Sequence, residues 1–182
     1  MMLTKTIGLA TLLTGKGKQK VLEFWDVFEE EYNSVGVQSF DYPNLGFQGG
    51  SCKDINSLIE DLIELCKKVR SFEFETHGIG YFEDTANVVY LSVDKNPNLK
   101  ELHNDLNSLM KRHCDNIFKL YEPDNWVPHI TLAMQDLSDD DLNRFKSEYK
   151  NAQNFNQEIN NIALVEFKTD GDVELLEKID IL

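Results

Sequence analysis

A short pattern occurs twice in the chain, and it constrains the fold more than any other feature. Residues 43–47 (PNLGF) align without gaps with residues 128–132 (PHITL), 85 positions later. Nearly the same offset relates residues 78–82 to residues 163–167, and one predicted helix to another. An offset shared by three elements predicts two copies of one βα unit. The alternative is a chance recurrence of common βα patterns.

The hydrophobic periodicity predicts strands and helices alternating in both halves. Strands are expected over residues 6–13, 37–47, 72–76, 88–93, 126–134, 159–168 and 173–181, and helices over 19–32, 54–69, 96–110 and 136–152. This order predicts an α+β fold in which residues 1–182 form a single bilobal domain. Its two pseudo-symmetric lobes, approximately 4–83 and 86–182, are βαβαβ-type halves. Each lobe should carry a mainly antiparallel sheet and outer helices around a central cleft.

Composition narrows the classes of partner. Hydrophobic residues make up 41% and charged residues 27% of the 182 positions, which is typical of a globular chain. The net charge of −14 argues against a protein that wraps long duplex nucleic acid. The apolar stretch Ile7–Leu13 is too short to span a bilayer and lacks a following cleavage site, so we expect a cytoplasmic protein without a membrane partner.

Cysteine and histidine positions do not form a metal-binding pattern. The three cysteines, Cys52, Cys66 and Cys114, are odd in number and widely spaced, and no CxxC motif or Cys/His cluster occurs. Neither a zinc site nor a disulfide framework is predicted, and we expect no metal and no cofactor. The sequence does not indicate an oligomeric state.

Strand parity brings four side chains of the repeated pattern together. Residues two apart on a strand point to the same side, so His129 and Thr131 should project into the space between the lobes. Asn44 and Gly46 should project into it from the other lobe. Two simpler readings stay open: His129 bonded to a neighbouring carbonyl as an ordinary strand residue, and Asn44 as a turn-prone residue after Pro43.

Residues 126–133 (WVPHITLA) resemble the second motif of the 2H phosphoesterase superfamily, which includes RNA 2′-5′ ligases and cyclic nucleotide phosphodiesterases. Other segments that resemble the family are 78–82 with 88–91, Leu102-His103 and Tyr121-Glu122-Pro123. The resemblance implies two His-x-Thr/Ser motifs facing across a cleft. One imidazole would act as general base and the other as general acid on a phosphate ester, without metal. The hydroxyls would hold phosphate oxygens.

The first motif departs from this pattern, because Asn44 stands at the position of its histidine and Gly46 at that of its hydroxyl. An asparagine amide does not exchange a proton near neutral pH, and losing one acid or base group typically costs about 10²–10⁴ in rate. His77 could substitute, but it shares a strand face with Glu73 and Glu75 that should be solvated.

The resemblance therefore implies a 2H phosphoesterase-like protein that acts on or binds an RNA end or a 2′,3′-cyclic nucleotide, with weak or lost catalysis. Its partner would be a small phosphate-bearing ligand or an RNA terminus. His129 and Thr131 are the candidate catalytic residues. Candidate substrate-binding residues are Asn44, Tyr81, Phe82, Tyr90 and Trp126, although aromatic residues on strands more often belong to the core. The alternative is a non-catalytic nucleotide-binding or protein-interaction module on the same scaffold.

Overall fold

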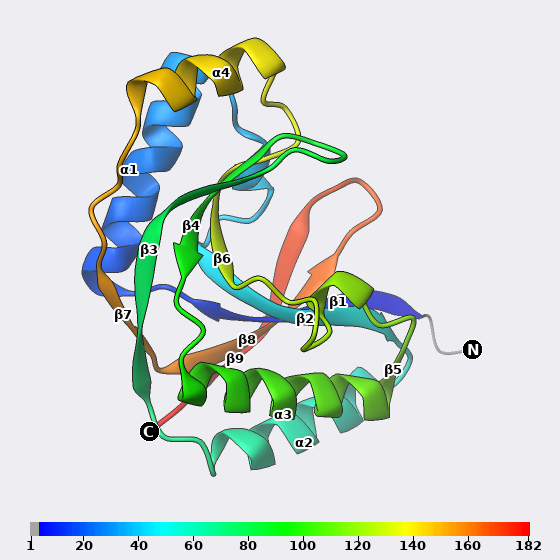
Figure 1. The fold of residues 1–182 in the computed structure, drawn as a ribbon. Helices are drawn as coiled ribbons and strands as arrows, with labels where there is room; N and C mark the ends of the chain where they lie inside the picture. The colour runs from blue at the N-terminus through cyan, green and yellow to red at the C-terminus, as the bar shows by residue number, and fades with distance from the viewer. Residues whose placement is uncertain (1–3) are drawn as a thin grey trace.

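The structure, a computed structural model, describes residues 4–182, whose strands form two antiparallel sheets (Figure 1). The larger sheet has the order β5 (Cys114–Asp115), β2 (Asn44–Cys52), β1 (Lys5–Leu12), β8 (Asn161–Phe167) and β9 (Val173–Asp180). The smaller has the order β6 (His129–Ala133), β4 (Val88–Val93), β3 (Phe72–Phe82) and β7 (Asn156–Ile159). The predicted α+β class with antiparallel sheets is confirmed.

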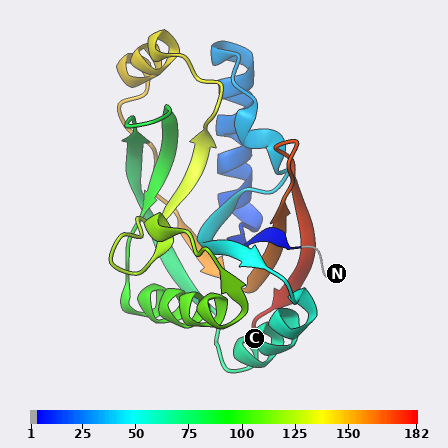
Figure 2. The ribbon, with the colours of Figure 1, turned by 90° about the vertical axis from the view of Figure 1, so that its right-hand side faces the viewer.

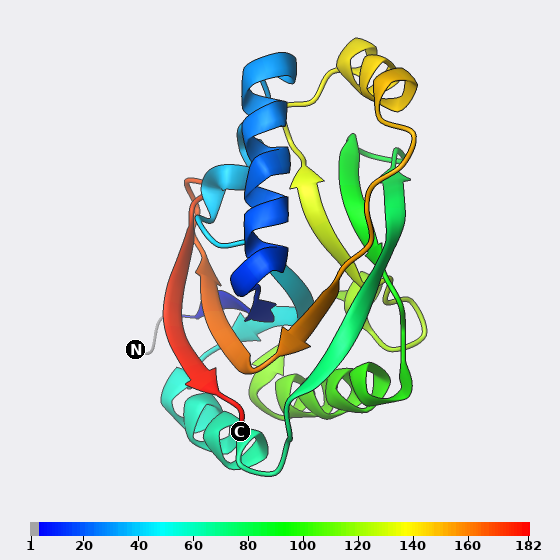
Figure 3. The same ribbon diagram turned by 90° about the vertical axis from the view of Figure 1, so that its left-hand side faces the viewer.

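Four helices cover the sheets: α1 (Gly15–Tyr32), α2 (Ile55–Cys66), α3 (Pro97–His113) and α4 (Asp139–Glu148). The helices α2 and α3 lie side by side, with α3 against β2 (Figure 1). Figure 3 shows α1 between the two sheets, where it packs against β6. None of the helices within residues 4–182 is long and apolar enough to cross a membrane.

Each sheet contains strands from both halves of the chain. The two copies of the repeated unit are β1-α1-β2-α2-β3 and β4-α3-β6-α4-β8, but β3 pairs with β4 and β8 pairs with β1. Each half therefore contributes its third strand to the sheet of the other half. The predicted lobe boundaries, 4–83 and 86–182, do not coincide with the sheets, because hydrogen-bonded strands from both segments make up each sheet.

Several element boundaries also differ from the prediction; β3, for example, continues to Phe82, beyond the expected end at residue 76. The helix α1 begins at Gly15, four residues early, and α4 ends at Glu148, four residues before the expected end. Residues 36–39 form a 3-10 turn, η1 (Gly36–Ser39), where a strand was expected. The Asp136 carboxylate, 100 positions away, accepts the backbone N–H of Val35 and of Gly36. This long-range contact bends the segment, and periodicity cannot reveal it.

A side chain caps the start of three of the helices. Asp54, Asn96 and Ser138 each accept a hydrogen bond from a backbone N–H three residues further on. These caps satisfy donors that the first turn of a helix leaves free. They fix where α2, α3 and α4 begin.

His103 of α3 ties this helix to the segments that border the cleft. Its ring stacks on Trp126, with ring centroids 3.8 Å apart and planes 3° from parallel. Its Nε2 lies 3.0 Å from the carbonyl oxygen of Phe47 and 2.9 Å from that of Tyr121. Since carbonyls only accept, Nε2 carries a proton and donates to both. Burial lowers the pKa of His103 to about 4, so the buried ring stays neutral.

The free energy of unfolding should fall as the pH drops from 6.5 to about 4, because His103 gains its proton more easily in the unfolded chain. The stabilising contribution of the neutral His103 ring is complete above pH 6.5. Acidification to about pH 4 removes it and lowers the free energy of unfolding by at most about 3 kcal/mol. His103→Gln removes this titration. The stability difference between wild type and variant should therefore narrow from pH 7.5 to pH 4.5 in urea unfolding.

The control is His77→Gln on the exposed side of β3, which should follow the wild type at every pH. A difference between wild type and His103→Gln that stays constant across this range would contradict the assignment of a neutral buried imidazole.

Candidate functional site

The two copies of the repeated pattern lie on facing strands, β2 and β6, which border one cavity of about 280 Å³. Figure 2 shows that β2 and β6 belong to opposite sheets. Asn44 and Gly46 line this cavity from β2, and His129 and Thr131 line it from β6. The structure therefore brings together the four positions that the offset and the strand parity relate.

The two strands have matching registers as well as matching sequences. On β2, Asn44 and Gly46 pair with β1, and on β6, His129 and Thr131 pair with β4. Each pairing contains a register shift one step beyond the second motif residue, at Leu9 on β1 and at Val89 on β4. The equivalent bulges indicate that the repeat is structural and is not a chance match between two short sequences.

Two tryptophans hold the motif strands by equivalent bonds. The indole N–H of Trp25 on α1 donates to the carbonyl oxygen of Thr131 at 3.2 Å. The indole N–H of Trp126 donates to the carbonyl oxygen of Gly46 at 3.1 Å. Gly46 and Thr131 occupy the same position in the two copies. The backbones of both motif strands are therefore fixed by these bonds before any ligand binds.

The tautomer of His129 follows from its backbone contact. Its Nδ1 lies 2.7 Å from the carbonyl oxygen of Val127, so Nδ1 carries the proton and donates. Burial lowers the pKa of His129, and the bond to Val127 only partly opposes this effect. The neutral ring consequently has a lone pair on Nε2, which can accept a proton. The bond to a neighbouring carbonyl was the simpler reading left open for this residue, and here it fixes the ring.

The β2 side of the cavity offers an amide and an open space. The side-chain amide of Asn44 donates to the carbonyl oxygen of Tyr42 at 2.9 Å. A Cβ added at Gly46 would lie 3.5 Å from the ring of Tyr121, an ordinary contact distance. The position aligned with Thr131 therefore has room for a side chain.

Four of the five predicted substrate-binding residues do not line the cavity. Trp126 is only 2% exposed and its ring is covered by His103, so no base can stack on it. Tyr90 is 8% exposed and stacks on Phe82 at 4.3 Å, and both rings lie against His129. Tyr81 carries Lys146 over its ring at 4.7 Å. These aromatic residues support His129 from behind or lie elsewhere, and only Asn44 of the five lines the cavity.

His77 is also absent from the cavity lining, so it does not occupy the place of the missing first histidine. The aromatic residues that do line the cavity were not predicted as ligand contacts from the sequence; they are Trp25, Phe40, Phe47, Phe118, Tyr121 and Phe167. Two glycines, one on β1 and one on β2, could have indicated two of these aromatic residues. Gly8 and Gly49 are cross-strand partners, and each leaves room for a ring, Phe167 over Gly8 and Phe118 over Gly49.

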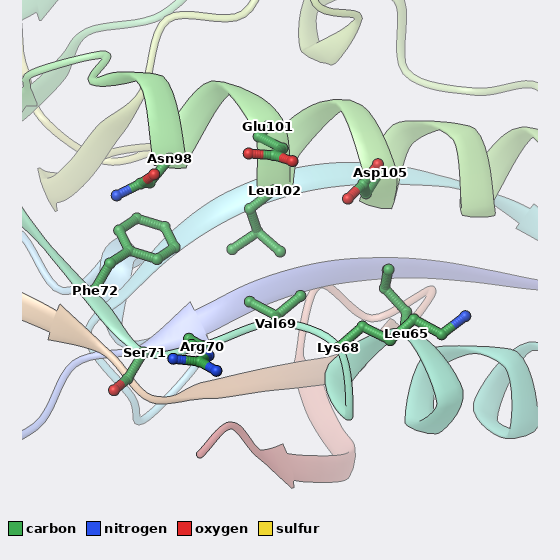
Figure 4. Close-up of a pocket in the computed structure, with 10 residues that line it drawn as sticks. All are labelled: Leu65, Lys68, Val69, Arg70, Ser71, Phe72, Asn98, Glu101, Leu102 and Asp105. Carbon is green, nitrogen blue, oxygen red and sulfur yellow. The ribbon is translucent and has the colours of Figure 1, made fainter.

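A second cavity, of about 370 Å³, lies between α3 and the segment that follows α2 (Figure 4). Lys68 and Arg70 border it on one side, and Glu101 and Asp105 of α3 on the other. All four charged side chains are exposed, and no residue of the repeated pattern reaches this cavity. It is therefore separate from the candidate site. Residues 4–182 also contain no group of three or more His, Cys, Asp or Glu side chains placed to hold a metal ion.

Comparison with known proteins agrees with this fold. A family model for the 2'-5' RNA ligase superfamily matches residues 40–171. The chain is similar to TT0787 of Thermus thermophilus, with a TM-score of 0.62, 18% identity and 97% of both chains covered. It is similar to E. coli LigT complexed with 3'-AMP, with a TM-score of 0.61, 15% identity, and 98% of this chain and 99% of that chain covered. No curated protein matches the chain in sequence.

Two glycine substitutions on β2 should have different effects. Gly46→Ala should change the free energy of unfolding by no more than about 0.5 kcal/mol, because its Cβ has room. Gly49→Ala should destabilise by about 1–3 kcal/mol, because its Cβ would lie 2.3 Å from the Phe118 ring and 3.0 Å from the carbonyl oxygen of Ile7. Urea unfolding measures both. Equal effects would show that the space over Gly46 is not open.

Proposed function

Because the chain belongs to the 2'-5' RNA ligase superfamily, we propose that it binds a nucleotide or the end of an RNA strand in the cleft between β2 and β6, with weak or lost catalysis. The observation that carries the proposal is the composition of the two aligned positions. His129 and Thr131 keep a proton acceptor and a hydroxyl on β6, whereas Asn44 and Gly46 on β2 provide neither a titrating group nor a hydroxyl.

His129 is suited to accept a proton from a ligand hydroxyl or from water. Its Nδ1–H is engaged by Val127, and its lowered pKa keeps Nε2 unprotonated at neutral pH. Thr131 adds a hydroxyl that can donate to a ligand oxygen from the same face of β6. These two side chains suffice for binding and for the removal of one proton.

Hydrolysis of a 2′,3′-cyclic phosphate needs a second group that delivers a proton to the departing oxygen. Asn44 stands at that place and cannot do so. Tyr121 is the other titratable side chain that lines the cavity, and burial raises the pKa of its phenol above the ordinary 10.0. It holds its proton firmly at neutral pH, which makes it a weak acid for this step. We therefore propose slow turnover or none.

Support for a phosphate-bearing ligand comes from proteins of similar fold. The E. coli LigT structures were determined with 3'-AMP and with phosphate, and the chain covers nearly all of each. A small phosphate-bearing ligand or an RNA terminus is therefore the partner that we propose. The cytoplasmic location expected from the sequence remains part of the proposal.

Thr131→Val should weaken the binding of 3'-AMP by about 3- to 10-fold, the effect of one lost hydrogen bond of roughly 1 kcal/mol. Valine keeps the β-branched shape that suits the strand and removes only the hydroxyl. Isothermal titration of both proteins measures the change, and Thr6→Val, at an exposed position of β1, is the matched control.

Equal affinities of wild type and Thr131→Val would place the binding site elsewhere. If neither 3'-AMP nor inorganic phosphate binds to the wild type, the cleft is not a nucleotide site, and the protein-interaction module on the same scaffold becomes the better explanation.

The double change Asn44→His with Gly46→Thr should raise the hydrolysis of 2′,3′-cyclic nucleotides by about 10²–10⁴ over a slow wild type. The imidazole supplies the missing proton-transfer group, and the Thr side chain enters the open space over β2. Adding His129→Ala should abolish the gain, because two proton-transfer groups act as one unit.

Wild-type turnover on the order of 1 s⁻¹ or faster would contradict this account. In that case another side chain already delivers the second proton. Tyr121→Phe would then test the phenol, which lines the cavity, in place of His77, which does not.

A further inference from the structure

We infer that the cleft recognises the uncharged nucleoside part of its ligand, the aromatic base and the ribose hydroxyls, more strongly than the phosphate. The inference rests on the proposed function and names the part of the nucleotide that supplies the affinity. It follows from three properties of the cavity lining: its charge, its hydrogen-bonding groups and its rings.

The residues that line the cavity carry no formal charge at neutral pH. None of the residues that line it is a Lys, Arg, Asp or Glu. His129, the one side chain there that could become cationic, is held neutral because burial lowers its pKa. The chain as a whole carries a net charge of −14, which repels an approaching phosphate. A dianionic phosphate would therefore leave water without meeting an opposite charge.

The polar groups of the lining match neutral hydroxyl and amide partners. Nε2 of neutral His129 accepts a hydrogen bond, so it suits a ribose hydroxyl and opposes a phosphate oxygen, which also only accepts. Ser39, at the end of η1, is also one of the residues that line this cavity. Its hydroxyl oxygen is buried and has no hydrogen-bond partner among the residues that the structure describes. A buried polar atom without a partner costs free energy, and a ligand group of matching polarity would satisfy it.

The rings of Phe118, Tyr121 and Phe167 form an aromatic wall of the same cavity. The centroid of the Phe118 ring lies 6.0 Å from that of Phe167 and 6.4 Å from that of Tyr121. Phe167 is 39% exposed, so part of its ring is free for contact. Nucleic-acid bases stack on such rings without help from charge. At about 280 Å³ the cavity is near the lower limit of ligand pockets, which suits one nucleotide and not several.

The inference is tested by titrating the protein with adenosine, uridine, 3'-AMP and inorganic phosphate at pH 7.5. The dissociation constant of the better-bound nucleoside should lie within about tenfold of that of 3'-AMP. Inorganic phosphate should not displace the bound nucleoside. Raising NaCl from 50 to 300 mM should change the dissociation constant of 3'-AMP less than about twofold, because binding that neutralises no phosphate releases no counterions.

Substitutions separate the two parts of the ligand. Phe167→Leu should weaken the binding of adenosine and of 3'-AMP by the same factor, between about 5- and 50-fold, because the base loses its stacking partner. Ser39→Ala should likewise weaken both by a common factor. Tyr42→Leu, which removes an equally exposed ring outside this cavity, and Ser51→Ala on β2 are the controls and should change neither affinity. Melting temperatures measured alongside exclude unfolding as the cause.

The outcomes distinguish the inference from the function on which it rests. If 3'-AMP binds more than about 100-fold tighter than either nucleoside, and phosphate competes with it, the cleft is a nucleotide site but recognition is centred on the phosphate, and the inference is wrong. If no nucleotide, nucleoside or phosphate binds, the proposed function itself fails. Equal loss of binding in Phe167→Leu and in Tyr42→Leu would also contradict the role of the aromatic wall in stacking the base.

Discussion

The pairing of β1 with β8, and of β4 with β3, is the constraint on which the arrangement of this protein depends. Without it the two sheets would separate into small pieces, β5-β2-β1, β8-β9, β4-β6 and β3-β7, and two-stranded ribbons of this kind are marginally stable in water. By exchanging third strands, the two halves build sheets of five and four strands over a shared core. The same exchange fixes β2 and β6 relative to each other, since each is hydrogen-bonded to a strand that is anchored by the opposite half.

Both motif strands have an unpaired edge beside the second motif residue, which is Gly46 on β2 and Thr131 on β6. The strand β6 is the edge of its sheet, and β5 pairs with β2 only at Ser51 and Cys52, well beyond Gly46. Trp25 and Trp126 each donate an indole N–H to a carbonyl oxygen on these strands, at the equivalent positions Thr131 and Gly46. The bonds satisfy backbone acceptors that the sheets leave free. They also explain why Trp126 is buried and unavailable to a ligand.

The site is a neutral cavity in a strongly acidic protein. Its one imidazole is neutral because burial disfavours the charged form, and its tautomer is fixed by the carbonyl of Val127. Phe82 and Tyr90 lie against that imidazole. The result is a proton acceptor whose position is well supported, facing an amide that cannot complete an acid–base pair. Scaffold and chemistry are therefore separable here: the fold keeps the geometry of a two-motif cleft, whereas one of the motifs lacks its reactive groups.

The sequence by itself determined the repeat and the faces of its strands, because periodicity and strand parity are local properties of the chain. Asn44, Gly46, His129 and Thr131 could thus be placed around one cleft from the sequence. The strand exchange, the exclusion of Tyr81, Phe82, Tyr90 and Trp126 from the cavity, and the presence there of Ser39, Phe118 and Phe167 were decided only by the tertiary structure. An aromatic residue on a strand is compatible with either core or cavity, and the choice depends on which distant strand pairs beside it and whether a glycine lies beneath its ring.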